Sequence, residues 1–233
     1  MEQQQRQLTE DQIKIEQANF IAKVYGWMCA ALLATGLTAW YVAQSEEIIV
    51  ALVTNKILFY GLLFGEILLV GYISRALPTM NVSMAKALFF LYAIANGLTL
   101  SLIFVIFTTT SIASAFFITA GTFAVMSVYG YYTKSDLTSM GKILMMALIG
   151  LVIASIVNIF MESTLLYWIT SYVGVFIFTG LIAYDTQKIK EMNIIGNEGT
   201  DEDTKESLMG ALTLYLDFIN LFLYILRIFG DRK

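Results

Sequence analysis

Long apolar stretches, each of about twenty residues, follow one another along most of the chain. Seven of them are long enough to cross a bilayer as helices. A threonine-rich break at residues 108–111 divides the third from the fourth. The predicted membrane spans are Ile21–Gln44, Ile57–Leu77, Met84–Phe107, Ile112–Tyr132, Met140–Met161, Thr164–Asp185 and Leu208–Phe229. Because the apolar runs are continuous and do not alternate with polar residues, they indicate helices and not a barrel.

The last span differs from the others because its polar residues share one face. Spacings of 4, 3, 4 and 3 residues place five side chains within roughly 80° of each other around a helix. These side chains are Thr213, Asp217, Asn220, Tyr224 and Arg227. Such a helix can lie on a membrane surface or stand inside a bundle with its stripe turned from lipid. A surface helix usually carries several basic residues on its polar face, and this one carries only Arg227, which favours the bundle interior.

The composition fixes the class of protein. Of 233 residues, 58% are hydrophobic and 14% charged, whereas roughly a quarter of a soluble domain is charged. We therefore predict an all-α integral membrane protein, with one seven-helix domain over residues 21–233. Residues 1–20 are polar and contain no apolar signal-peptide core, so they are predicted to form a cytoplasmic N-terminal segment. The net charge of −4, without a basic surface, gives no reason to expect a nucleic-acid partner.

The distribution of basic residues predicts the orientation. With the N-terminus in the cytoplasm, ten of the 14 Lys and Arg residues fall on the inner side and four on the outer side. The N-terminus is therefore expected inside and the C-terminus outside. The basic end of the chain, with Arg232 and Lys233, is the exception to this pattern.

Ionisable residues inside the spans need partners, because a charge at the bilayer centre costs on the order of 3 kcal/mol or more. Glu66 and Arg75 of the second span are about 13 Å apart along a helix, and Asp217 and Arg227 of the last span are about 15 Å apart. Two antiparallel helices could then pair Glu66 with Arg227 and Arg75 with Asp217. The first pair is equally well explained as a structural contact.

A second acid, Asp185, is expected at a similar depth, close to Asp217 and Arg75. Two neighbouring carboxylates do not both ionise readily, so this pair should titrate as one unit near neutral pH. Since the chain contains no histidine, it would be a pH switch built from carboxylates. The alternative is that Arg75 merely neutralises one acid, or extends toward the lipid headgroups.

Other polar residues in the spans predict packing. Asn96, Gly97 and Thr99 are expected to make interhelical hydrogen bonds and close contacts. Ser171, Gly174 and Asp185 share one face of the sixth span, which should meet the last span.

The acidic loop before the last span, within Thr186–Ser207, invites comparison with a calcium-binding EF-hand. Its acids do not follow the EF-hand spacing, so a solvated loop is predicted. Asp203 and Glu206 fit a capping box at the start of the last helix.

No catalytic constellation is found, and the chain is predicted not to be an enzyme. Two intramembrane aspartates raise the alternative of an aspartyl intramembrane protease, whose motifs are Tyr-Asp and Gly-x-Gly-Asp. Tyr184–Asp185 matches the first motif, but no glycine precedes Asp217 in Tyr215–Phe218.

Several segments together resemble the Bax inhibitor-1 family, in its bacterial branch. They are Val24–Met28 (VYGWM), Lys134–Leu137 (KSDL), Asn158–Phe160 (NIF), Ala183–Gln187 (AYDTQ), and Leu214–Phe222 (LYLDFINLF) followed by Leu226–Arg227. The resemblance extends over essentially the whole chain after residue 20. It implies a seven-helix fold with the last helix central, and a multi-pass protein of the bacterial inner membrane.

The resemblance also implies a function, a pH-sensitive calcium leak, with calcium as the permeant ion and no cofactor. Asp185 and Asp217 would form the pH sensor with Arg75, and would contact calcium transiently. Glu66 and Arg227 resemble a latch on the pore. Thr213, Asn220 and Tyr224 of the polar stripe would line the route between sensor and latch. The protein is expected to act as a monomer. Some relatives that lack the aspartates are regarded as modulators of a membrane-bound protease, which leaves a regulatory role as the alternative.

Overall fold

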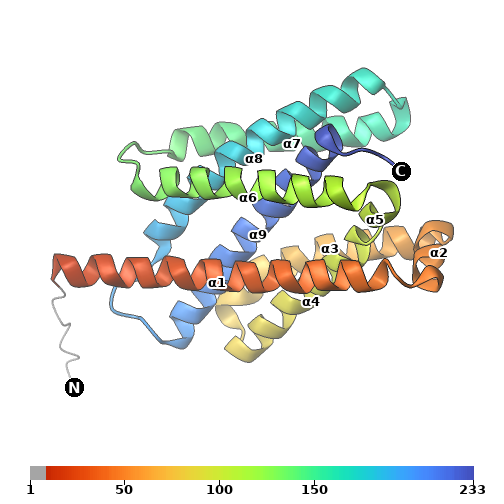
Figure 1. Ribbon diagram of the computed structural model, residues 1–233. Coiled ribbons are helices and arrows are strands. Elements are labelled where there is room, and N and C mark those ends of the chain that lie inside the picture. The colour runs from red at the N-terminus through yellow and green to blue at the C-terminus, as the bar shows by residue number, and fades with distance from the viewer. Residues whose placement is uncertain (1–8) are drawn as a thin grey trace. The chain divides into compact units, whose positions relative to one another are not determined.

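The computed structural model describes residues 9–233, and the chain there is helical almost throughout (Figure 1). Its elements are α1 (Glu10–Val42), α2 (Glu46–Thr54), α3 (Lys56–Ala76), η1 (Leu77–Thr79), α4 (Val82–Leu100), α5 (Ile103–Ile106), α6 (Thr109–Tyr132), α7 (Thr138–Met161), α8 (Thr164–Met192) and α9 (Asp201–Phe229). Seven of the described helical segments are long and apolar enough to cross a membrane. The predicted all-α class with seven membrane spans is confirmed.

The break predicted between the third and fourth spans is confirmed. Thr108 has an extended backbone, and its side-chain oxygen accepts a hydrogen bond from the N–H of Ser111 at 3.2 Å. A threonine in this position caps the first turn of a helix, so α6 begins at Thr109. The third predicted span is itself interrupted. A turn at residues 101–102 separates α4 from the single helical turn of α5.

The first helix begins earlier than predicted. Residues 10–20 belong to α1, although they were predicted as part of a polar segment outside the first span. Thr9 and Gln12 form a capping box, in which each side chain accepts a hydrogen bond from the other residue's backbone N–H. Residues 1–8 of the predicted segment lie outside the described residues. The short helix α2 was not predicted, because its nine residues are too few for a membrane span.

The chain divides into two compact units, and α8 and α9 each continue from one into the other. Unit 1 comprises the described residues up to Leu100 together with Ile189–Leu212. Within it, α1 packs against α4 at Gly97, where an added Cβ would lie 2.7 Å from the backbone oxygen of Thr35. The Thr35 hydroxyl donates to the carbonyl of Ala93 at 2.8 Å. The close packing predicted at Gly97 is therefore confirmed.

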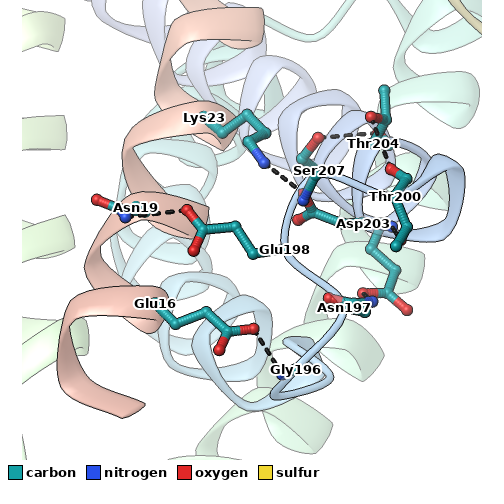
Figure 2. A network of polar contacts seen from close by, with 12 residues as sticks. Glu16, Asn19, Lys23, Gly196, Asn197, Glu198, Thr200, Asp203, Thr204 and Ser207 are labelled. Atoms are coloured by element: carbon teal, nitrogen blue, oxygen red, sulfur yellow. Dashed lines mark hydrogen bonds and ion pairs between the residues drawn. The ribbon is translucent and has the colours of Figure 1, made fainter. Parts of the chain in front are cut away.

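The loop before α9 and the first turn of α9 are held to α1 by three polar contacts within unit 1 (Figure 2). The backbone N–H of Gly196 donates to Glu16 at 2.7 Å, and the Asn19 amide donates to Glu198 at 3.0 Å. Lys23 forms an ion pair with Asp203, in the first turn of α9. The loop is thus anchored to α1.

The capping box predicted from Asp203 and Glu206 is wrong. Helix α9 begins at Asp201, and the N–H of Asp203 donates to the hydroxyl of Thr200 at 3.2 Å. Thr200 therefore caps the helix, one turn earlier than predicted. The Asp203 carboxylate is 1% exposed, and it accepts hydrogen bonds from Lys23 and from the Gly199 N–H.

Unit 2 comprises Ser101–Lys188 and Thr213–Lys233. Its helices pack closely at glycines. An added Cβ at Gly130 of α6 would lie 2.2 Å from the backbone oxygen of Ala183 on α8. At Gly174 of α8 it would lie 2.7 Å from the ring of Tyr224 on α9. The prediction that the Gly174 face of the sixth span meets the last span is confirmed.

The last helix is the most buried of the seven spans. In its most apolar 18-residue window, 67% of the residues are buried, against 11–39% in the other six. This burial agrees with the prediction that the last helix is central in the bundle.

Candidate functional site

The two intramembrane aspartates come together within unit 2. Asp185 of α8 is 8% exposed and Asp217 of α9 is 5% exposed. Their carboxyl groups are neighbours, close enough for each to act on the other. Two neighbouring carboxyl groups can share a hydrogen bond only when one of them carries a proton, because an ionised carboxylate can only accept. The structure therefore brings together the two acids that were predicted to form a pair.

Packing on either side fixes where these acids point. Tyr184, next to Asp185, lies against Gly141 of α7, where an added Cβ would be 2.5 Å from the ring. Phe218, next to Asp217, makes edge contacts with Phe116 and Phe123 of α6, each with ring centroids 5.6 Å apart. These contacts set the rotation of α8 and α9 about their axes, so both carboxyl groups are held in a defined position.

One carboxyl oxygen of the aspartate pair lacks a hydrogen-bond partner in the described part of the chain. The Oδ2 atom of Asp217 is buried and has no hydrogen-bond partner among residues 9–233. A buried polar atom without a partner is unusual and marks either strain or a functional group. Lys188 is the nearby cation, because its charge interacts with Asp185 and its Nζ lies 5.9 Å from the Tyr184 ring centroid. Nothing in the sequence signalled this lysine, which follows Asp185 by three residues on α8.

Arg75, the third member of the predicted sensor, lies in the last turn of α3 and its side chain is exposed. It belongs to unit 1, whereas Asp185 and Asp217 belong to unit 2. Its contact with the aspartates stays a prediction.

Glu66 is buried, and its partners within unit 1 are neutral. Glu66 is 7% exposed. Apart from Glu66, Ile73 is the one residue of α3 that is buried. Thr99 and Asn96 of α4 donate hydrogen bonds to the Glu66 carboxylate at 3.0 and 3.3 Å. The sequence predicted that these two residues form interhelical hydrogen bonds, but it did not identify Glu66 as the acceptor. Their spacing of three residues, which places both on one helical face, was the signal that could have identified them as partners of a buried acid.

Arg227 lies in unit 2 among aromatic rings. Its guanidinium carbon is 5.0 Å from the ring centroid of Tyr167 and 5.3 Å from that of Tyr224. These distances are typical of cation–π contacts. The predicted pairing of Arg227 with Glu66 joins residues of different units and stays a prediction.

The other stripe residues of α9 pack within unit 2. Thr213 and Asn220 are half-buried, and the Asn220 amide donates to the carbonyl of Leu216 at 2.8 Å. Tyr224 stacks on Phe178 of α8, with ring centroids 5.9 Å apart. Their predicted role in lining a route for ions stays a prediction.

A resident metal site would need more ligands than the aspartate pair supplies. Within the described part of the chain, no group of three or more His, Cys, Asp or Glu side chains could hold a metal ion. Ca²⁺ takes six to eight oxygen ligands, more than the two carboxyl groups supply.

Comparison with known proteins agrees with this architecture. Residues 17–233 match the family model described as "Inhibitor of apoptosis-promoting Bax1". The inner membrane protein YbhL of Escherichia coli (strain K12) is 49% identical over 215 residues, 92% of each chain. The uncharacterized protein RP147 of Rickettsia prowazekii is 46% identical over 92% of this chain and 90% of its own. An uncharacterized protein of Borreliella burgdorferi is 45% identical over 92% of both chains. The match over nearly the full length confirms the resemblance seen in the sequence motifs, and the chain belongs to the Bax inhibitor-1 family of membrane proteins.

Proposed function

We propose that the protein is a pH-sensitive calcium leak channel, controlled by the Asp185–Asp217 pair. The observation that carries this proposal is the pair itself: two buried, neighbouring carboxyl groups on two helices long and apolar enough to span a membrane. Intramembrane ionisable residues commonly mark ion or proton pathways. The similarity to YbhL supports a place in the bacterial inner membrane.

A single proton gives the pair two states. With the proton, one carboxyl group can donate a hydrogen bond to the other, which would link α8 to α9. Without it, two negative charges lie side by side in a medium of low dielectric constant and repel each other. The unprotonated pair also attracts a divalent cation more strongly. Proton loss therefore changes both the contact between the helices and the affinity for calcium.

The remaining residues take parts that follow from their positions. Arg75 would respond to the charge of the pair, and Glu66 with Arg227 would form the latch. Thr213, Asn220 and Tyr224, which share the stripe of α9 with Asp217, would line the route. The proposal includes a monomeric channel, and assigns the chain no catalytic reaction and no resident cofactor.

The test is calcium flux through purified protein in liposomes that contain no other protein. We expect wild-type protein to pass calcium down its gradient, at a rate that changes between about pH 6 and pH 8, where a shared proton can be lost. Protein-free liposomes measure the background. A matched control is Glu202→Gln, because Glu202 is an exposed acid in the first turn of α9, and this variant should keep the wild-type profile.

The result also separates the channel from the regulatory alternative. A modulator of a membrane-bound protease should pass no calcium in the absence of its partner. Background flux from folded, correctly inserted protein at every pH would therefore reject the channel and leave the regulatory role.

A further inference from the structure

A cavity of about 480 Å³ opens in unit 2, where α7 ends, α8 begins and α9 ends. Its lining includes the polar or aromatic side chains of Asn158, Glu162, Tyr167, Trp168, Arg227 and Arg232. Neither the aspartate pair nor its neighbour Lys188 belongs to this lining. The cavity is therefore separate from the proposed pH sensor.

Two guanidinium groups converge on one ring in this cavity. Arg232 donates to the Tyr167 hydroxyl at 3.0 Å, and its guanidinium carbon lies 5.9 Å from the ring centroid. Arg227 lies 5.0 Å from the same centroid. Glu162 is the one acid among the lining residues described, so the cavity carries a net positive charge. Two cations beside one ring attract an anion more strongly than either would alone.

The backbone holds Arg232 in place. The Thr108 N–H donates to the Asp231 carbonyl at 3.1 Å, and the Lys233 N–H donates to the Ile106 carbonyl at 2.9 Å. These bonds form a short antiparallel bridge between Phe107 and Arg232. The residues after α9 are thus fixed at the cavity. Arg232, one of the two basic C-terminal residues that did not fit the predicted orientation, therefore has a local role there.

The surroundings place the cavity at the edge of the membrane. Trp168 is 39% exposed and Tyr172 is 58% exposed, and their rings stack with centroids 6.0 Å apart. Exposed tryptophan and tyrosine at the ends of membrane helices gather at the level of the lipid headgroups. Thr164, the first residue of α8, also lines the cavity, and the positive end of a helix dipole favours an anion there.

We propose that this cavity binds an anionic phosphate group, presented either by a phospholipid headgroup or by free phosphate in solution. Guanidinium groups bind phosphate through two parallel N–H···O bonds, and Arg is preferred over Lys for this reason. Arg227 and Arg232 supply two such groups, and the open cavity has room for a headgroup. The proposal does not rest on calcium conduction, although Arg227 is also assigned to the proposed latch.

The experiment is native mass spectrometry of the purified protein in a neutral detergent, with three separate probes. They are phosphatidylglycerol, phosphatidylcholine with the same acyl chains, and inorganic phosphate. We expect about tenfold tighter binding of phosphatidylglycerol than of phosphatidylcholine, and an approximately tenfold loss of that affinity in Arg232→Gln, as for one charged hydrogen bond. Lys142→Gln, which removes an exposed cation near the start of α7, at the other end of that helix from the cavity, should change nothing.

A second variant should change the affinity for phosphatidylglycerol in the opposite direction. Glu162→Gln removes the acid from the lining and should tighten the binding of phosphatidylglycerol severalfold by removing its repulsion. If Arg232→Gln does not fold, this variant decides alone, and unchanged or weaker binding would overturn the proposal.

The probes distinguish the source of the phosphate. Binding of inorganic phosphate that depends on Arg232, with no preference for phosphatidylglycerol, supports the site and assigns it to the free anion. Equal binding of both lipids without any binding of inorganic phosphate overturns the proposal. An equal loss in Arg232→Gln and Lys142→Gln overturns it as well, because the effect would then reflect net charge alone.

Discussion

Helix α9 contains two buried aspartates whose neighbouring side chains differ in charge. Asp203, in its first turn, is 1% exposed and pairs with the cation Lys23 and with the Gly199 N–H. Asp217, farther along, is 5% exposed, its neighbour is the acid Asp185, and its Oδ2 has no partner among the described residues. The charge of Asp203 is compensated by a cation, whereas Asp217 lies beside a second acid.

The difference shows that burial alone does not make a carboxyl group a switch. A buried acid beside a cation is stable in its charged form, so it serves as an anchor. A buried acid beside another acid changes its interactions when one proton leaves. Glu66, with its two neutral donors, is a third arrangement, in which a carboxyl group can accept hydrogen bonds in either protonation state. Variants at each site test this distinction.

The largest effect is expected from Gly130→Ala, which obstructs the packing that holds Asp185. The added Cβ would lie 2.2 Å from the backbone oxygen of Ala183, and a backbone atom inside a helix cannot give way. We expect a loss of about 3 kcal/mol in the free energy of unfolding, measured by denaturation in mixed micelles. Gly121→Ala on the same helix, with no atom within 4 Å of its Cβ, is the matched control. A similar loss in both variants would contradict this account.

The next effect is expected at the anchor. Lys23→Met leaves the buried Asp203 carboxylate without its cation, and should lower the free energy of unfolding by about 2 kcal/mol, somewhat below the usual cost because Lys23 is partly exposed. In a double-mutant cycle, Asp203→Asn should cost much less in the Lys23→Met background than in the wild type. Additive losses would show that the two side chains do not interact.

At the aspartate pair the stability change should be small and depend on pH. Asp217→Asn resembles the protonated acid, so the free energy of unfolding should change by less than about 1 kcal/mol at acid pH, where the carboxyl group is protonated in the folded and the unfolded wild type. As the pH rises, the unfolded wild type releases this proton before the folded pair does, so the wild type loses stability over that range and the variant should become the more stable protein. The comparison is made by thermal unfolding at a series of pH values. A large loss at low pH would mean that Asp217 acts as an anchor like Asp203.

The smallest effect is expected at Asp136, an exposed acid in the loop before α7. Hydrogen bonds from Thr138 lower the pKa of its carboxyl group below the ordinary value of 3.8. Because the folded-state pKa is the lower one, the stabilisation is present above 3.8 and disappears as the pH falls through the folded-state value. Asp136→Asn should therefore lower the melting temperature slightly at pH 7 and leave it unchanged at a pH below the folded-state pKa of Asp136. An equal change at both pH values would rule out this titration.

Hydrophobic length predicted the membrane spans well, because a bilayer fixes how long an apolar helix must be. It missed the start of α1, where residues 10–20 are polar and helical and where Glu16 and Asn19 bond to a distant loop. Such contacts join residues about 180 positions apart, and no local pattern encodes them. The short helices α2 and α5 fall below the length that the bilayer selects.

The aspartates were recognised from the sequence because acids inside apolar spans are rare. The partners of Glu66 were not, because polar residues such as Asn96 and Thr99 are common in membrane helices and charge pairing suggested an arginine instead. The cavity beside Tyr167 was also missed. It depends on a backbone bridge between Phe107 and Arg232 that no periodicity reveals.

The central claim is that one proton on the Asp185–Asp217 pair controls calcium flux. The most direct measurement is the pH profile of calcium flux in protein-only liposomes, for wild type, Asp217→Asn and Asp185→Asn. Each variant removes one titrating carboxyl group and with it the shared proton. The account predicts a flux that changes with pH in the wild type and is flat between about pH 6 and pH 8 in both variants. A wild-type profile retained in either variant would contradict it.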